Sequence, residues 1–432
     1  MTAPQPPAAA TDPSRRVIRP LTDFLQTESA GGILLAIGAA IALAWANSPW
    51  SDAYDRLWHT RAGLSLGSLA LHLDLRHWVN DGLMAVFFLV VGLEIKRELI
   101  EGELRDRSQA ILPALAALGG MLVPAAIFVA LTAGTGDVSG WGVPMATDIA
   151  LAVGVLGLLG SRVPSAGKVF LLALAIVDDL GAIAVIAIFY SDGLAWGWLA
   201  GAGVCVVAVL VARRRAASLT PVFVVLGTML WLCLHEGGIH ATIAGVIMGF
   251  LTPVQAHTHP DLIDIDELTD LSSVEHARAT VTLARSSVSK VEWLEHVLHP
   301  WTSFVIVPVF ALANAGVIVN GSAIDGALGS RAAWGVALGL LVGKPVGITV
   351  ATWLACRAGA ARLPAGVNLR MVAALGTLAG IGFTVSLFIT ELAFTDPDTA
   401  AAAKLAILVA SLAAAMAGAA AVKSSAVELR GE

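Results

Sequence analysis

The sequence predicts an all-α polytopic membrane protein with about twelve transmembrane helices. Of its 432 residues, 57% are hydrophobic and only 13% are charged, whereas an average soluble domain is about 25% charged. The mean hydropathy is +0.80, and the apolar residues form blocks of about 17 to 25 residues, long enough to cross a hydrocarbon core of roughly 30 Å. Lys and Arg gather in alternate loops, as the positive-inside rule describes. The first partner that we expect is therefore the lipid bilayer, and no feature indicates nucleic acid.

The chain divides into two short tails and one membrane domain. Residues 1–22, rich in Pro and Ala, are predicted to be a disordered cytoplasmic tail. Residues 23–425 form a single transporter domain, in which 253–296 are a cytoplasmic loop, and 426–432 are a cytoplasmic C-terminal tail. The predicted spans are approximately 31–47, 79–95, 111–132, 142–160, 167–190, 194–211, 220–235, 238–252, 297–318, 334–356, 371–393 and 401–422. Most of the 26 Lys and Arg residues fall on one side, which places both termini in the cytoplasm.

The outer loop between spans 1 and 2 carries a two-residue repeat. Leu69, Leu71, Leu73 and Leu75 alternate with other residues, a period typical of a β-strand or hairpin. Two interpretations stay open. The hairpin covers its own helical bundle, or it offers an edge to a second protomer.

Three cysteines lie in or beside apolar blocks. Cys205, Cys233 and Cys356 are odd in number and distant from one another, which argues against a disulfide framework or a metal knuckle. We interpret them as packing residues and expect no cofactor.

The most informative residues are two acids inside span 5. Asp178 and Asp179 lie near the middle of the apolar segment 170–190, where an ionisable residue costs several kcal/mol and indicates function. Neighbours on an α-helix point about 100° apart, so one carboxylate can face an ion path while the other faces a protein partner. Lys344 is the cation deep inside a predicted span, whereas Lys168 and Lys404 lie at span ends, and pairing Lys344 with one aspartate leaves the other acid unpaired. A purely structural ion network is the alternative.

A buried carboxylate of this kind suits ion exchange. Burial can bring its protonation into the physiological range, and its oxygens also suit a small hard cation such as Na⁺ or Li⁺. Competition between the proton and the cation then produces exchange.

Two spans contain residues that interrupt helices. Span 4 combines Pro144 with Thr147 and Asp148, and span 11 contains Gly380 and Gly382, followed by Thr384. Paired interrupted helices mark a binding site at the bilayer midplane in transporters. We expect Asp148 to neutralise a pair of helix N-termini and Lys344 a pair of C-termini.

Several motifs together closely resemble the bacterial NhaA family of Na⁺/H⁺ antiporters. They extend over nearly the whole chain after the N-terminal tail. The matching segments are 80–88 (NDGLMAVFF), 91–99 (VGLEIKREL), 146–150 (ATDIA), 173–183 (ALAIVDDLGAI), 240–242 (HAT), 294–301 (LEHVLHPW), 343–345 (GKP) and 380–384 (GIGFT).

The resemblance implies an electrogenic, pH-regulated exchange of cytoplasmic Na⁺ or Li⁺ for protons across the bacterial inner membrane. It implies inverted-topology repeats, with spans 4 and 11 crossing as broken helices at the midplane. Asp179 is then the cation ligand and proton carrier, Asp178 is its partner and faces Lys344, and Na⁺ binds at these two aspartates. Thr147 and Asp148 fall at the break of span 4, and Gly380, Gly382 and Thr384 fall at that of span 11.

The resemblance also implies sites of pH response and self-association. The hairpin near 64–75 matches the family's dimer contact. The longer 255–295 loop departs from the family pattern and bears on pH dependence more than on transport. The residues that match the region of pH response are Glu94, Glu98, His240, Glu295, His296 and His299.

Three alternatives to antiport were weighed. Proton- or Na⁺-coupled symport of a small organic anion on a similar fold needs a roomier polar crossing, where Lys344 would hold the anion. An intramembrane protease would need two acids converging on one water, which adjacent helical residues cannot provide. A structural scaffold leaves the charges at the midplane unexplained. We therefore expect a transporter and no enzyme.

Overall fold

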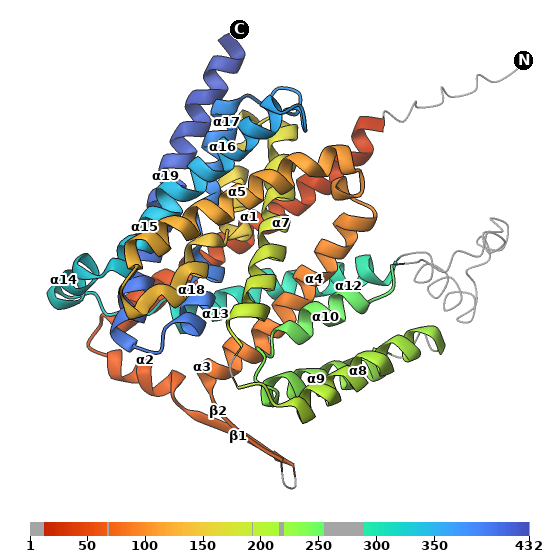
Figure 1. The fold of residues 1–432 in the computed structure, drawn as a ribbon, viewed down its shortest axis with the longest axis vertical. Coiled ribbons are helices and arrows are strands. Elements are labelled where there is room, and N and C mark those ends of the chain that lie inside the picture. The colour runs from red at the N-terminus through yellow and green to blue at the C-terminus, as the bar shows by residue number, and fades with distance from the viewer. Residues whose placement is uncertain (1–12, 67–68, 192, 216–219, 255–288, 432) are drawn as a thin grey trace, which may run out of the picture.

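A computed structural model describes residues 13–431, apart from 67–68, 192, 216–219 and 255–288 (Figure 1). The described part is almost entirely helical. The elements of its N-terminal half are α1 (Pro13–Ala46), α2 (Ser51–Trp58), β1 (Arg61–Leu66), β2 (Leu69–Asp74), α3 (Leu75–His77), η1 (Trp78–Leu83), α4 (Met84–Ile100), η2 (Glu103–Arg105), α5 (Arg107–Thr132), η3 (Gly136–Met145), α6 (Ile149–Leu159), η4 (Gly160–Arg162) and α7 (Ser165–Phe189).

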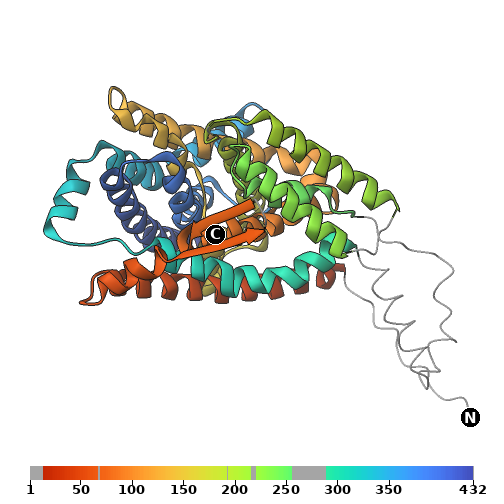
Figure 2. The ribbon, with the colours of Figure 1, turned by 90° about the horizontal axis from the view of Figure 1, so that it is seen from below.

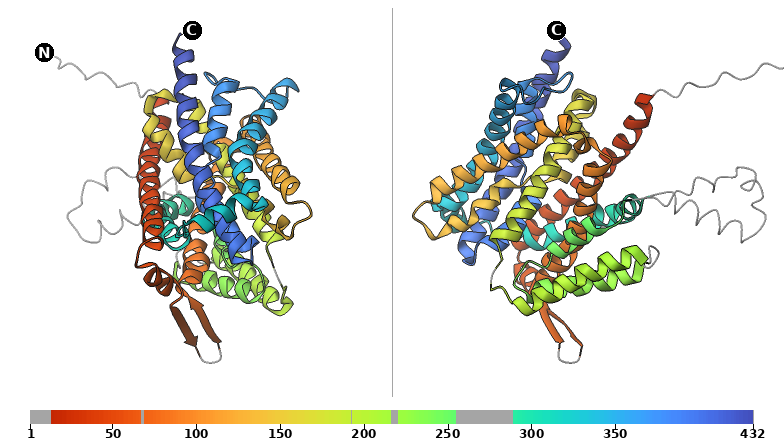
Figure 3. Two further views of the ribbon diagram at one scale, coloured as in Figure 1. Left: turned by 90° about the vertical axis from the view of Figure 1, so that its left-hand side faces the viewer. Right: turned by 45° about the vertical axis from the view of Figure 1, so that its right-hand side comes forward.

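The second half begins with a helical pair that stands apart from the bundle. The remaining elements are α8 (Trp196–Arg215), α9 (Thr220–Glu236), α10 (Ile243–Leu251), α12 (Lys290–Trp301), η7 (Thr302–Ile306), α13 (Val307–Asn314), α14 (Gly321–Gly329), α15 (Arg331–Leu338), η8 (Gly339–Gly343), α16 (Lys344–Arg357), α17 (Leu369–Ala379), α18 (Phe383–Ala393) and α19 (Pro397–Gly431). Figures 1 and 3 show α8 and α9 side by side at the edge of the molecule.

Eight helical stretches within the described residues are long and apolar enough to cross a membrane. The pair α17 and α18, bent by 51° at its break, adds a ninth if it is counted as one span. Apolar side chains cover the outside of these helices, and Leu122, Leu158 and Ile188 are 66%, 74% and 70% exposed. Such an apolar surface is stable only in lipid, so the predicted helical membrane protein is confirmed at this level.

The tightly packed part of the bundle surrounds α5. This helix packs against α7, α15, α16 and η3. Gly119 and Gly347 allow the closest approach, because a Cβ atom at either position would lie 2.3 or 2.1 Å from the other's carbonyl oxygen. A methyl group at either site would therefore separate α5 from α16.

A second group of helices lies beside α5 and its neighbours. In this second group, α4 packs against α10 and α12, and α1 packs against α13. Helix α1 also packs closely against α6. The view of Figure 2 shows α1 and the α12–α13 segment along the same side of the molecule. The chain passes from α7 to α10 through the α8–α9 pair, which shares a small core with α10 around Leu230, Leu234 and Ala244.

The β-hairpin projects from one end of the bundle, and the C-terminal end of α19 projects from the other (Figure 1). The two strands of the hairpin are antiparallel, with Arg61 paired with Asp74 and Leu66 with Leu69. The connecting residues 67–68 lie outside the described part.

Helices extend into three segments that the sequence analysis assigned to tails or a loop. Helix α1 begins at Pro13, inside the stretch 1–22 predicted as a disordered tail, and residues 1–12 lie outside the described part. Helix α12 begins at Lys290, before the predicted end of the 253–296 loop, most of which is also outside it. Helix α19 continues to Gly431, through most of the predicted tail 426–432.

Candidate functional site

Helix α7 carries both aspartates into the interior of the bundle. Asp178 and Asp179 are 1% and 5% exposed, and the apolar residues around them keep the helix regular from Ser165 to Phe189. Consecutive residues on this helix face different neighbours. The two carboxylates consequently have different partners.

Lys344 is the partner of Asp178. The lysine is 0% exposed and begins α16, directly after the π-helical turn η8. Its Nζ forms an ion pair with Asp178 Oδ2 and donates a hydrogen bond of 2.7 Å to Thr147 Oγ1. A buried charge pair is stable only when its remaining hydrogen bonds are also made, and Thr147 makes one of them.

Two interrupted helices meet beside this ion pair. The 3₁₀-helix η3 ends at Met145 and α6 begins at Ile149, while α17 ends at Ala379 and α18 begins at Phe383. The backbone N–H of Asp148 donates to Ile381 O (2.6 Å). Thr147 Oγ1 donates to Ala379 O (2.9 Å). Each break thus satisfies backbone groups of the other, as unwound backbone away from water requires.

Asp148 lies between two helix N-termini. Its Oδ1 accepts from the N–H of Leu151 in α6 (2.9 Å), and its Oδ2 accepts from the N–H (3.0 Å) and Oγ1 (2.7 Å) of Thr384 in α18. The partial positive charges of both helix ends favour a carboxylate at this position. Lys344 lies on the other side of the crossing, near Thr147 and the C-terminus of α17.

Two glycines let the breaks approach each other. A Cβ atom at Gly380 would lie 2.5 Å from Leu340 O. A Cβ atom at Gly382 would lie 2.3 Å from Ser386 Oγ and 3.2 Å from Ala146 O. At Gly380 the short contact is with the backbone of η8, which cannot rotate away, so this position requires glycine; at Gly382 it is with a side chain of α18, and the other break is at the longer distance.

Asp179 has a different environment from Asp178. The Oδ1 atoms of both aspartates are buried without a hydrogen-bond partner within the described residues, but Asp178 also has Lys344 paired with its Oδ2. Asp178, Glu94 and Asp148 are acidic neighbours that act on Asp179 electrostatically, and Lys344 is a basic one. A buried oxygen without a partner among several acids suits a proton or a small cation, so the donor set fits the predicted cargo.

The residues predicted for pH response fall into two places. Glu94 (9% exposed) and Glu295 (5% exposed) are buried on α4 and α12, where Glu295 forms an ion pair with Arg97, and Lys96 donates to the carbonyl oxygens of Phe250 and Thr252. Glu98 lies near the end of α4, and His296 and His299 are in α12, exposed and half-buried. His240 lies apart, just before α10, with 6.4 Å between the centroids of its ring and the ring of Phe388, in a T-shaped arrangement.

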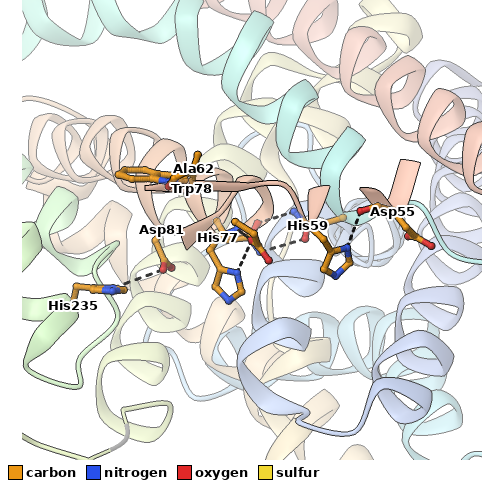
Figure 4. A network of polar contacts seen from close by, with 10 residues as sticks. Asp55, His59, Ala62, His77, Trp78, Asp81 and His235 are labelled. Carbon is orange, nitrogen blue, oxygen red and sulfur yellow. Dashed lines mark hydrogen bonds and ion pairs between the residues drawn. The ribbon is translucent and has the colours of Figure 1, made fainter. Parts of the chain in front are cut away.

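Two polar features had not been predicted from the sequence. Tyr190 accepts a hydrogen bond from the N–H of Gly142 (3.2 Å) and donates to Ser139 O (2.7 Å), which links the end of α7 to η3. Asp81 in η1 faces His235 in α9 (Figure 4). For Tyr190, the available signal in the sequence was the rarity of tyrosine, since the chain has two. Asp81 and His235 lie 154 positions apart, so no local sequence pattern connects them.

Comparison with known proteins identifies the family. The family model described as Na⁺/H⁺ antiporter 1 matches residues 22–422. The chain belongs to this family. It is 48% identical to the Na⁺/H⁺ antiporter NhaA 2 of Myxococcus xanthus (93% of this chain, 88% of that protein) and 46% identical to NhaA 3 of Frankia alni (97% and 91%). It is also 46% identical to NhaA of Rhodopirellula baltica (94% of each chain). The resemblance to NhaA antiporters and the Na⁺/H⁺ antiport that it implies are thereby confirmed.

Proposed function

We propose that this antiporter exports cytoplasmic Na⁺ or Li⁺ in exchange for more than one proton at Asp179 and Asp178, by alternating access. The observation that carries the assignment of the site is the pair of adjacent buried aspartates, each with an Oδ1 that has no hydrogen-bond partner in the described part, with Asp178 and not Asp179 in the ion pair with Lys344. Asp178 is held by Lys344 in the same interior. Protons and the cation compete for the carboxylates, and Asp179 is the principal exchanging group.

The crossing of the broken helices supports this assignment. Thr147 and Asp148 fix the break before α6, and Gly380, Gly382 and Thr384 fix the one before α18. Because the backbone groups of Asp148, Ile381, Ala379 and Thr384 are bonded across the crossing, small rotations of the helices can change which groups face a bound ion. Exchange between two orientations of the bundle then gives alternating access.

The twelve-span topology is part of the proposal. The eight long stretches and the bent pair supply nine spans, and η1 with α4, α9 and α10 supply three shorter ones. Inverted repeats relate the halves that contain α6 and α18. Both termini lie in the cytoplasm of a bacterial inner membrane, which the positions of the Lys and Arg residues support. The β-hairpin then lies on the outer face.

Net movement of charge and regulation by pH complete the proposed cycle. Exchange of one Na⁺ for more than one proton is driven by the membrane potential, at about 2.3 kcal/mol per charge per 100 mV. We assign pH response to Glu94, Glu98, His240, Glu295, His296 and His299. The ion pair between Arg97 and Glu295 joins α4 to α12, and protonation of the nearby groups would alter how these helices pack.

We also propose that the hairpin joins two protomers. In the described residues its sheet has two strands, and each has one unpaired edge. Such an edge can pair with the same edge of another copy, consistent with a homodimer.

The test is ion-induced proton movement in proteoliposomes that contain the purified protein and a pH-sensitive dye. Addition of Na⁺ or Li⁺ should move protons in the opposite direction, faster when valinomycin and K⁺ remove the opposing potential. Proton movement that requires an added organic anion would instead indicate symport. Equal rates with and without valinomycin would contradict electrogenic exchange.

A further inference from the structure

A second acid–base pair lies at the end of the molecule that carries the hairpin. Asp81 Oδ2 in η1 is 3.9 Å from His235 Nδ1 in α9 (Figure 4). Their side chains are 17% and 26% exposed. Both groups therefore exchange protons with the surrounding water more readily than the groups at the crossing.

A stack of three aromatic rings supports this pair. The indole of Trp78 stacks on that of Trp231, with 6.2 Å between ring centroids and 11° between planes. Trp231 in turn stacks on the His235 imidazole, at 5.4 Å and 4°. The indole N–H of Trp231 donates to the Asp81 backbone oxygen (2.8 Å), and that of Trp78 to Ala62 O in the hairpin (2.8 Å). The imidazole is thus held between an indole face and a carboxylate.

Both neighbours of the imidazole interact more strongly with a positive charge than with a neutral ring. A positive charge over an indole face gains about 0.5–1 kcal/mol at exposed sites, and a partly exposed ion pair gains about 0.2–1 kcal/mol. A neutral imidazole loses most of both interactions. Proton binding at His235 and attachment of α9 to η1 are therefore coupled.

Other titratable groups lie near Asp81 and His235. His240, before α10, and His77, in α3, act on Asp81 electrostatically together with His235. His77 has Asp74 as its own partner, at 2.6 Å between Nδ1 and Oδ1. Glu236 follows His235 and is exposed. Asp81 is thus the acid closest to His235 among the described residues, and His235 is the base that contacts it.

The helix that this pair attaches connects the two groups of helices. The α8–α9 pair shares a small core with α10 and joins α7, which carries Asp179, to α10, which packs on α4. Within the described residues, α9 is attached to η1 by the hydrogen bond from Trp231 to the Asp81 backbone oxygen and by the ion pair between His235 and Asp81. A change in these contacts alters how the connection is held.

We propose that Asp81 and His235 form an outer proton-binding site, separate from the aspartates of the crossing, whose occupancy fastens α9 to the start of α4. The assignment to the outer face rests on the proposed function and its topology. As the outer pH falls, His235 binds a proton and the connection between α7 and α10 becomes more rigid. The exchange rate then depends on outer pH through a group that does not carry the transported ion.

Tryptophan fluorescence of the purified full-length protein tests proton binding without transport. A protonated imidazole quenches an indole stacked on it, so emission should show a transition between about pH 5 and 8. His235→Gln should remove that transition, and His235→Phe should remove it while keeping a ring on Trp231. His59→Gln is the matched control, because His59 is exposed beside Trp58 and bonds to Asp55 O; it should keep the transition.

Asp81→Asn identifies the counter-ion. Its transition should move to lower pH by roughly half a unit, a factor of about three in proton affinity, because the imidazolium loses a carboxylate. An unchanged midpoint would contradict the pairing. A transition of full size in His235→Gln would overturn the proposed site.

A transport measurement links the site to exchange. In proteoliposomes at fixed inner pH, His235→Gln should flatten the dependence of Na⁺ flux on outer pH between about pH 5 and 8, whereas a profile identical to that of the wild type would overturn the regulatory role. Asp179→Asn, which the proposed function expects to be inactive in transport, should keep the fluorescence transition. Its fluorescence therefore separates failure of the outer site from failure of the proposed exchange site.

Discussion

The central crossing and the outer pair both place an acid next to a base, but they differ in burial. At the crossing, Lys344 and Asp178 are 0% and 1% exposed, and hydrogen bonds from two broken helices fix their surroundings. At the outer pair, His235 and Asp81 are 26% and 17% exposed and 3.9 Å apart. A buried charge left alone costs several kcal/mol, whereas an exposed one is hydrated. The comparison shows that the pair at the crossing is desolvated and fixed by hydrogen bonds, whereas the outer pair is partly hydrated, which fits the exchange role proposed for the first and the regulatory role proposed for the second.

The largest expected effect is loss of the buried cation. Lys344→Met leaves the Asp178 carboxylate without its counter-ion and should lower the free energy of unfolding by about 3–5 kcal/mol. Thermal unfolding of the purified protein measures this. The double variant Lys344→Met with Asp178→Asn should recover much of the loss, because no unpaired charge remains. Asp81→Asn, the matched change at the outer pair, should cost below about 1 kcal/mol; equal costs at the two sites would remove the contrast.

A methyl group at the crossing should have the next largest effect. Gly380→Ala brings a Cβ atom to 2.5 Å from Leu340 O, a backbone atom that cannot rotate away. We expect a loss of about 1–3 kcal/mol together with slower exchange, measured by thermal unfolding and by proteoliposome flux. Gly321→Ala is the control, because no atom lies within 4 Å of its Cβ position. Normal stability of Gly380→Ala would show that the breaks pack less closely than described.

The carboxylate between the two helix N-termini should contribute somewhat less. Asp148→Asn keeps an oxygen for one of its donors but loses the charge that favours both N-termini. A loss of about 1–2 kcal/mol in thermal unfolding follows. Thr384→Ser retains the hydroxyl that bonds to Asp148 and should be nearly neutral, whereas a loss as large as that of Asp148→Asn would assign the effect to the Thr384 methyl group.

The smallest of these effects concerns the end of α7. Tyr190→Phe removes the hydroxyl that bonds to Ser139 O and to the N–H of Gly142. We expect a loss of about 1 kcal/mol in thermal unfolding and retained exchange. Complete loss of exchange would instead place Tyr190 within the transport machinery.

Much of the fold could be predicted because lipid imposes long apolar blocks. The segments around Leu122, Leu158 and Ile188 are visible in the sequence and are lipid-facing helices in the structure. Gly380 and Gly382 likewise mark the position where α17 and α18 separate. Helix ends were less predictable, because the start of α1 at Pro13 has no apolar signal.

Contacts between distant residues limited prediction of the site. Helical geometry separates the directions of Asp178 and Asp179, but it does not determine which one meets Lys344, 166 residues away from Asp178. The hydrogen bonds of Thr147 and Asp148 to residues more than 230 positions away depend on the tertiary fold. The stack of Trp78, Trp231 and His235 depends on it in the same way.

The most direct test of the central claim compares two variants for Na⁺-induced proton movement in proteoliposomes. Asp179→Asn should abolish the movement, because it removes the carboxylate that binds the cation and the proton. The double variant Asp178→Asn with Lys344→Met should retain Na⁺-dependent exchange, because it removes a charge pair and leaves Asp179 in place. Exchange at the wild-type rate in Asp179→Asn would contradict the assignment of Asp179 as the exchanging group.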